Sequence, residues 1–331
     1  MQAYIVSKTD LKVKDFSTLT SYEINEDSAT DAPSGFGFAQ APLAVIGDFI
    51  LLQNQYLGVI SGIETDKKLS SVILRSLPIQ SLFSRNILLG SPNAITEAYV
   101  ATAIQDNFVS SGDVLSDIPY LSVAANTQTS LGITPHNENG IYNLNTFLRY
   151  VAIRHQIFSD FHLTPNSLNV TLECRTPPIR VIDATVADVL SLSETVVSEC
   201  VSKVTVKTAS SAVTYYLFDN GTFGTDPNAG TRLTGKVDTV YCENPSDVIQ
   251  TASDIFSKNQ FSHLIEMEIA SGSKLYETTN MKLFDRALIR TKSGVYNSYI
   301  SFKGLRSTSK SVLFKFGDAR LALTDKLKGG I

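Results

Sequence analysis

Short apolar runs alternate with polar breaks along most of the chain, which is the pattern of β-strands joined by turns. In the first ninety residues the runs fall at Gln2–Val6, Asp48–Leu52, Tyr56–Ile60 and Ser70–Leu77. The second and third runs flank the polar break Gln53-Asn54-Gln55, and this arrangement predicts a β-hairpin. We therefore expect residues 1–90 to form one β module.

A longer polar segment, Glu26–Pro42, interrupts this module and predicts a loop, because Asp, Ser, Pro and Gly are frequent in it. Within it, Gly35-Phe36-Gly37-Phe38 places two aromatic side chains on a permissive backbone. Two interpretations stay open for this tetrapeptide. It is either an exposed apolar tip that contacts a partner subunit, or part of a loop that folds over its own core.

The spacing of apolar residues changes to a helical period between residues 91 and 165. Ser91-Pro92 resembles a helix start, and the following apolar positions recur at helical spacing: Ala94, Ala98, Ala101, Ile104 and Phe108. A second helix is predicted over Leu144–His155. Between the two helices, the connector Thr127–Asn143 has little periodicity and is a candidate for movement on assembly. We interpret residues 91–165 as a helical insert.

Strand-like runs return in residues 166–331, which we interpret as a second β region. The predicted strands are Leu168–Cys174, Ile179–Ile182, Val201–Lys207, Tyr215–Phe218, Val237–Tyr241 and Leu264–Ile269. A helical turn is predicted at Val186–Leu192, and Pro245 opens a predicted helix that continues through Phe256.

The two β regions share an internal repeat. Tyr56, Ile60 and Ser61 recur 240 residues later as Tyr296, Ile300 and Ser301, and the same offset aligns Ser71–Arg75 with Ser311–Lys315. Asp48 then corresponds to Asp285, with a hairpin loop three residues longer in the second copy. The repeat, at residues 281–325, predicts an α+β, mainly β fold with two related small β-barrel modules and a helical insert. Barrel closure would remove exposed sheet edges.

Composition adds limits to this picture. The 331 residues suffice for two domains, and a 43% hydrophobic and 18% charged content is that of a globular protein. No apolar run reaches the roughly 18 residues of a membrane-spanning helix, and the N-terminus lacks the pattern of a secretory signal. We expect synthesis and folding in the cytoplasm. The net charge of −4 and the scattered Lys and Arg predict no nucleic-acid-binding surface, although a passage for DNA needs none.

Motifs of enzyme chemistry are missing from the sequence. There is no GxSxG, no phosphate-binding glycine motif and no HExxH, and the histidines are dispersed, at His136, His155, His162 and His263. Three cysteines at irregular spacing, Cys174, Cys200 and Cys242, predict small buried side chains and no disulfide framework. We expect no catalytic residues, no metal site and no cofactor.

Two acidic features have ordinary structural interpretations. The segment Asp219–Gly230 superficially resembles a calcium loop, but it lacks the EF-hand order, and Asn220-Gly221 favours a long hairpin loop. Whether an ion binds there stays open. Glu266 and Glu268 alternate on a predicted strand and therefore point the same way. A glycosidase would place such a pair in an aromatic-lined cleft, and the absence of tryptophan disfavours one.

Several of these segments resemble the tail hub proteins of tailed bacteriophages, also known as baseplate hubs or the structural part of tail-associated proteins. The resemblance lies in Gly47–Ile63 followed by Pro78–Phe83, and in Ser298–Phe302 followed by Val312–Leu323. It extends over most of the chain, but through β patterning more than invariant chemistry.

The resemblance implies a structural, non-enzymatic protein of the virion tail tip. It implies a homotrimer whose six barrels adapt a hexameric tail-tube or distal-tail ring to a threefold tip, with other tail-tip or receptor-binding proteins as neighbours and DNA as passing cargo. Insertion into a membrane is not expected. The alternative is a β-sandwich that binds a receptor or surface glycan through the loops Glu26–Pro42 and Asp219–Gly235.

Overall fold

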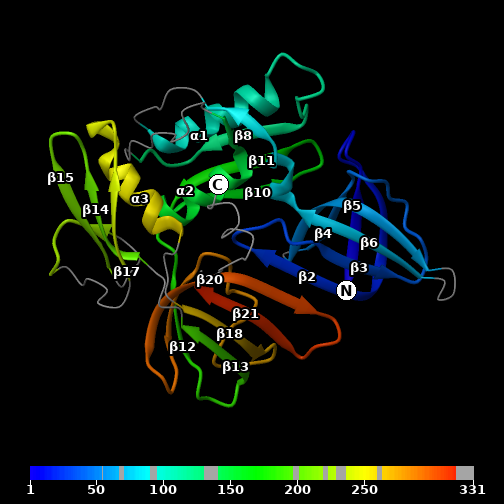
Figure 1. Cartoon of the computed structure of the whole chain (residues 1–331). Coiled ribbons are helices and arrows are strands. Elements are labelled where there is room, and N and C mark those ends of the chain that lie inside the picture. The colour runs from blue at the N-terminus through cyan, green and yellow to red at the C-terminus, as the bar shows by residue number, and fades with distance from the viewer. Residues whose placement is uncertain are drawn as a thin grey trace. The chain divides into compact units, whose positions relative to one another are not determined.

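The computed structural model describes residues 1–53, 55–66, 71–89, 95–129, 141–196, 201–218, 223–228, 236–258 and 263–317. The chain divides into two compact units. The first contains Met1–Pro177 together with Gly304–Ser309, and the second contains Pro178–Lys303 together with residues 310–331. Each unit holds one β-barrel and one smaller α/β part (Figure 1).

The first barrel is a closed ring of six antiparallel strands. In ring order these are β1 (Gln2–Val6), β4 (Phe49–Leu52), β5 (Tyr56–Asp66), β6 (Ser71–Pro78), β3 (Ser34–Phe38) and β2 (Val13–Asp27), which pairs again with β1. Alternate residues point inward, so Ile5, Ile24, Phe36, Ile50 and Ile60 form a buried core.

The segment Gly35–Phe38 lies inside β3 and not at a loop tip. All five residues of β3 are buried, so of the two interpretations the exposed partner contact was wrong, and the predicted loop is a strand at these residues. The two aromatic rings fill the barrel, and the glycines face crossing side chains. A Cβ on Gly37 would lie 2.3 Å from the Ser21 hydroxyl oxygen, which explains why this strand alternates glycine with phenylalanine.

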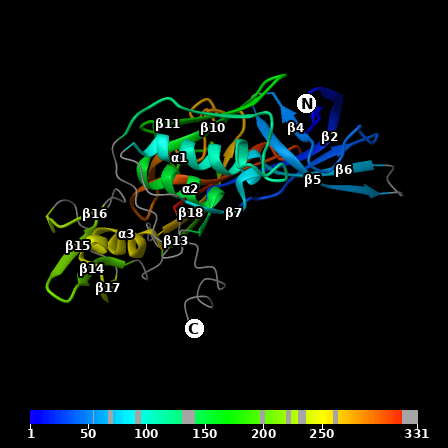
Figure 2. The ribbon, with the colours of Figure 1, turned by 90° about the horizontal axis from the view of Figure 1, so that it is seen from above.

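The smaller part of the first unit packs helices on a three-stranded sheet (Figure 2). The sheet consists of β10 (Ile157–Leu163), β11 (Leu168–Cys174) and β8 (Leu121–Ala125), and the helices are α1 (Thr96–Ile104), a following π-helical turn (Gln105–Val109) and α2 (Leu144–His155). A 3₁₀ turn (Ile79–Phe83) and the pair β7 (Asn86–Leu88) and β9 (Ile141–Asn143) join it to the barrel.

The helix predicted over Leu144–His155 is confirmed with the same bounds. Asn143 caps it, because its side chain accepts a hydrogen bond from the backbone of Thr146. The first predicted helix is confirmed over Thr96–Ile104, whereas its proposed start at Ser91-Pro92 lies outside the described residues.

In the described chain the second barrel has six strands, in the order β12 (Ile179–Asp183), β19 (Arg286–Arg290), β20 (Val295–Arg306), β21 (Ser311–Gly317), β18 (His263–Ala270) and β13 (Val189–Val196). The helical turn predicted at Val186–Leu192 was wrong, because most of that segment belongs to β13. The fully buried side chains of this barrel include Ile182, Ile265, Met267, Ile289, Ile300 and Phe314.

The repeat found in the sequence corresponds to equivalent strand pairings in the two barrels. In β4–β5, Phe49 faces Val59, and at the aligned positions of β19–β20, Arg286 faces Tyr299. The likeness extends beyond the segments recognised in the sequence. The pair β2–β3 has a bulge between Leu19 and Ser21, and β13–β18 has one between Val189 and Ser191. The two barrels are therefore related modules over five strands.

The two barrels differ in one strand. In the first barrel, β1 lies between β2 and β4 and pairs with both. In the second, β12 continues into β13 after a short turn and pairs directly with β19, in parallel. The strand that would correspond to β1 is therefore missing from the second ring of described strands.

The α/β part of the second unit interrupts the second barrel between β13 and β18. Its sheet has the order β16 (Phe223–Gly224), β15 (Ala212–Leu217), β14 (Val201–Lys207) and β17 (Lys236–Tyr241). A 3₁₀ turn (Pro245–Asp247) leads into α3 (Val248–Lys258), as predicted, and α3 lies against one face of this sheet (Figures 1 and 2). The domain bounds 1–90, 91–165 and 166–331 stay a proposal.

Candidate functional site

The residues considered for metal or thiol chemistry are not gathered in the described part of the chain. No group of three or more His, Cys, Asp or Glu side chains there could hold a metal ion. His155 ends α2, His162 lies on β10, and His263 is buried on β18, where its ring contacts the Ser298 hydroxyl at 2.9 Å. His136 lies outside the described residues.

The cysteines whose surroundings are described are free thiols. Cys174 is half-buried at the end of β11, and Cys242 is buried in the core between α3 and its sheet. Cys200 lies outside the described residues. Within the described chain, moreover, no helix is long and apolar enough to cross a membrane.

Glu266 and Glu268 point the same way along β18, as predicted, but the adjacent strand β21 provides their partners. Glu266 binds the Lys315 ammonium at 2.6 Å, and Glu268 accepts a hydrogen bond of 3.0 Å from Ser311. Cross-strand pairs of this kind stabilise a sheet.

A buried aspartate that binds a cationic side chain occurs at a corner of each barrel. In the first barrel the buried carboxylate of Asp48 accepts hydrogen bonds from the backbone N–H groups of Lys8, at 3.1 Å, and Val45, at 3.0 Å. The Lys14 ammonium, near the start of β2, binds the same carboxylate at 2.7 Å. We call this arrangement the aspartate corner.

The aspartate corner of the second barrel is built in the same way. The buried Asp285 carboxylate accepts a hydrogen bond of 3.2 Å from the Lys282 backbone N–H. The Arg180 guanidinium binds it through Nε at 2.8 Å and Nη2 at 2.7 Å. Arg180 is the second residue of β12, as Lys14 is of β2, so equivalent strands supply the cation.

The backbone turns in the same way at both corners. The residue before each aspartate has a left-handed conformation, with φ of 93° at Gly47 and 69° at Phe284. Gly47 N–H donates to the Ile60 carbonyl at 2.8 Å, and Phe284 N–H donates to the Ile300 carbonyl at 2.9 Å. A non-glycine residue in this conformation is uncommon, so the shared geometry indicates a common architectural constraint.

Each corner also carries an exposed apolar side chain at the same place. Val13, next to Lys14, is 58% exposed, and Ile179, next to Arg180, is 59% exposed. The chain thus presents one combination of features twice, namely a buried ion pair beside a solvent-facing aliphatic group. Such a duplicated surface can contact two identical partners in similar ways.

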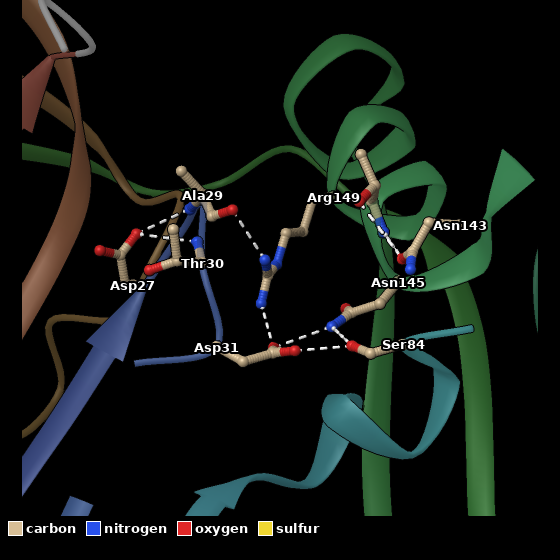
Figure 3. Close-up of polar contacts among 9 residues, drawn as sticks. Asp27, Ala29, Thr30, Asp31, Ser84, Asn143, Asn145 and Arg149 are labelled. Atoms are coloured by element: carbon tan, nitrogen blue, oxygen red, sulfur yellow. Dashed lines mark hydrogen bonds and ion pairs between the residues drawn. The ribbon is translucent and has the colours of Figure 1, made fainter. Parts of the chain in front are cut away.

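A second polar cluster fixes the segment after β2 to α2 within the first unit (Figure 3). The Asp31 carboxylate binds the Arg149 guanidinium and accepts hydrogen bonds from the Asn145 amide, at 2.8 Å, and the Ser84 hydroxyl, at 2.6 Å. Arg149 also donates to the Ala29 carbonyl at 2.8 Å. These bonds join the barrel to the smaller part of the unit, which is a structural role.

Structural contacts shift the pKa of several ionisable side chains, among them Glu97 and Tyr296. Burial alone would raise the pKa of the Glu97 carboxyl, but hydrogen bonds from Thr127 and Thr129 outweigh it and lower this pKa. The Tyr296 hydroxyl donates to Glu194, and this bond, with burial, raises the pKa of Tyr296 to about 12. Glu97 thus fixes the backbone at Thr129, and the Tyr296–Glu194 bond links β20 to β13.

Of the two loops predicted to bind a glycan, the first contains a buried strand and the second is described only in part. Ser34–Phe38, in the middle of the first loop, is a buried strand and cannot present a binding surface. Parts of the second loop, residues 219–222 and 229–235, lie outside the described residues, as does most of the connector Thr127–Asn143.

This chain, with its two barrels, has the fold of phage tail and baseplate proteins. No protein-family model and no curated protein matches the sequence. Among solved structures, the chain is similar to the prophage tail protein gp18 from Listeria monocytogenes, with a TM-score of 0.63 and 11% identity, over 99% of this chain and 98% of that one.

Two more solved structures agree. The 43 kDa tail protein of prophage MuSo2 from Shewanella oneidensis has a TM-score of 0.57 and 12% identity, over 95% and 98% of the two chains. A chain of the p2 virion baseplate in its activated conformation has a TM-score of 0.50 and 10% identity, over 95% and 98%. The resemblance found in the sequence is thus confirmed for the fold.

Proposed function

We propose that this protein is a structural component of a phage-type tail tip. In this proposal it is a homotrimeric hub that joins a hexameric tail-tube or distal-tail ring to a threefold tip and surrounds part of the path of DNA. It is made in the host cytoplasm and resides in the virion, beside other tail-tip or receptor-binding proteins. It performs no catalysis.

The observation that carries the proposal is the duplicated aspartate corner within matching strand order. A threefold ring has to contact a sixfold ring through two surfaces per chain, and these surfaces must be alike if the six partner subunits are identical. Two barrels that share pairings, a bulge, a turn and a buried ion pair meet this requirement. The likeness to tail and baseplate proteins over nearly the full chain supports the same class.

The Val13 and Ile179 positions are the proposed contacts with the sixfold ring. Both lie on the strand that supplies the cation to the corner, so the buried ion pair holds each aliphatic side chain at a fixed place on its barrel. The corner itself is structural, whereas the apolar side chain beside it is available to a partner.

The decisive experiment is electron microscopy of the purified full-length chain, with light scattering to give its mass. We expect a three-chain particle with threefold symmetry and six similar peripheral densities. A monomer at tens of micromolar, or a ring of another symmetry, would refute the hub proposal.

Contact with a sixfold partner is tested by Val13→Asp and Ile179→Asp. Each places a charge at an already exposed position, so the trimer should persist while binding to a tail-tube or distal-tail ring weakens. Leu275→Asp, at another exposed apolar position, is the matched control. Equal binding by all three variants would show that the corners do not contact the ring.

A further inference from the structure

The sheet of β14, β15 and β17 has one face buried and one face open. On β14, Ser202, Val204 and Val206 are buried toward α3, whereas Lys203, Thr205 and Lys207 point the other way. Because neighbouring residues across a sheet share a face, the pairings show which side chains join them: Thr214 and Tyr216 from β15, and Val237, Thr239 and Tyr241 from β17. We call this surface the open sheet face.

Its chemistry is apolar and basic. Val237 and Tyr241 are 66% and 61% exposed. The Lys203 ammonium lies 5.8 Å from the centre of the Tyr216 ring, and Lys207 is exposed at the end of β14. None of the described side chains on this face is acidic, so two positive charges lie among exposed aliphatic and aromatic groups.

A turn in the first unit has the complementary chemistry. In Ser110–Asp117, which we call the acidic turn, Val114 and Leu115 are 91% and 95% exposed, the highest values among the large apolar side chains of the described chain. Asp113 and Asp117 are the charged residues of this turn, and both are acidic.

Internal hydrogen bonds order the acidic turn. The Asp113 carboxylate accepts from the Leu115 backbone N–H at 3.0 Å and from the Ser116 hydroxyl at 2.9 Å. These bonds lower the pKa of Asp113, so it is charged at neutral pH. Asp117 accepts from the Ser111 backbone N–H at 2.8 Å. The acidic turn is therefore an ordered, negatively charged segment that exposes the apolar side chains of Val114 and Leu115.

We propose that the acidic turn of one subunit docks on the open sheet face of a second copy of this chain. Val114 and Leu115 would cover Val237 and Tyr241, while the two aspartates approach Lys203 and Lys207. The contact joins two different surfaces, so its repetition around a threefold axis closes a ring. This inference rests on the proposed trimer and identifies one of its interfaces.

The chemistry favours a second copy over nucleic acid as the occupant. Binding a polyanion depends on the number of phosphates that cationic groups neutralise, and this face offers two lysines. Exposed aliphatic groups at Val237 match Val114 and Leu115 better than they match a phosphate backbone. Burial of these side chains between subunits also removes the most exposed apolar groups of the described chain from water.

Leu115→Lys and Lys207→Glu test the docking, since both positions are exposed and the variants should fold as the wild type does in circular dichroism and thermal melts. We expect each variant to raise the concentration at which the trimer dissociates by at least about tenfold, measured by mass photometry and light scattering. The double variant restores an opposite-charge pair across the contact and should recover part of the loss. Leu275→Lys and Lys274→Glu are the matched controls.

The outcomes separate this inference from the hub proposal. A wild-type trimer that the two variants leave intact overturns the docking and leaves the hub proposal standing. A wild type that stays monomeric overturns both. If Lys207→Glu abolishes binding of a single-stranded DNA oligonucleotide while the trimer is intact, the face binds nucleic acid and the docking is refuted.

Discussion

Removing the carboxylate from one aspartate corner should destabilise its barrel far more than removing an exposed acid. In Asp48→Ala, the backbone N–H groups of Lys8 and Val45 lose their acceptor, and the Lys14 ammonium loses its partner. Breaking a buried ion pair from one side costs about 3–5 kcal/mol, and a buried donor without an acceptor costs about 1–3 kcal/mol. The Lys14 side chain is 31% exposed and can regain water, which offsets part of the loss.

We therefore expect Asp48→Ala to reduce the free energy of unfolding by about 3–4 kcal/mol. Asp285→Ala should cost somewhat less, about 2–3 kcal/mol, because the Asp285 carboxylate accepts one described backbone hydrogen bond instead of two. Asp48→Asn, which keeps an acceptor oxygen but loses the charge, should lie between Asp48→Ala and the wild type.

Differential scanning calorimetry of the full chain measures these losses. A loss of 3 kcal/mol corresponds to a decrease in Tm of about 6–12 °C for a cooperative unit of this size. Because two units can unfold in separate transitions, hydrogen exchange of β4–β5 and of β19–β20 assigns each loss to its barrel. Glu243→Ala, at an exposed position, is the control. Surface substitutions usually change the free energy of unfolding by less than about 0.5 kcal/mol. If the values for Asp48→Ala and Asp285→Ala both lie within about 0.5 kcal/mol of the control value, the reasoning is wrong.

Three further predictions concern other contacts. In a double-mutant cycle of Asp31→Ala and Arg149→Ala, urea unfolding should give a coupling of about 1–2 kcal/mol, and full additivity would contradict the ion pair. The pKa of Glu97 is lower in the folded state than in the unfolded state. Its contribution to the free energy of unfolding is therefore present above the unfolded-state pKa and is lost as the pH falls through the folded-state pKa. Glu97→Gln should therefore reduce the loss of stability below about pH 4.5, as measured by melts across pH, and an unchanged pH profile would refute this. Gly317→Ala should lower the free energy of unfolding by at least about 2 kcal/mol, because the φ of Gly317 is 86° and a Cβ there would lie 2.3 Å from the His263 carbonyl oxygen. A melting temperature equal to that of the wild type would refute this prediction.

Much of the fold could be predicted because hydrophobic periodicity determines local structure. The β4–β5 hairpin and α2 have strong two-residue and 3.6-residue patterns, and the structure confirms both. By contrast, Gly35–Phe38 was predicted as loop because glycine is usual in turns. Its strand depends on side chains that cross from β2 and β6, which are tertiary contacts that local sequence does not encode.

The candidate site could be predicted only in part. The alignment of Asp48 with Asp285 could be found in the sequence, by allowing a hairpin loop three residues longer in the second copy, but their cations could not be found. Lys14 precedes Asp48 by 34 residues, whereas Arg180 precedes Asp285 by 105, because the β14–α3 part is inserted between the two elements of the second corner. A repeat whose connections differ so much in length has no constant offset in sequence, and the shared pairings are visible only in three dimensions.

The α/β part inserted between β13 and β18 has a consequence for biosynthesis. All six strands of the first barrel lie within residues 2–78, so this ring can close while most of the chain is still being synthesised. The second barrel needs β12 near residue 180 and β21 near residue 317, and its closing pair β12–β19 joins strands more than a hundred residues apart. We expect the first barrel to fold on the ribosome and the second to complete only after β21 has been synthesised, when few unfolded strands of the first barrel remain to mispair with its sister module.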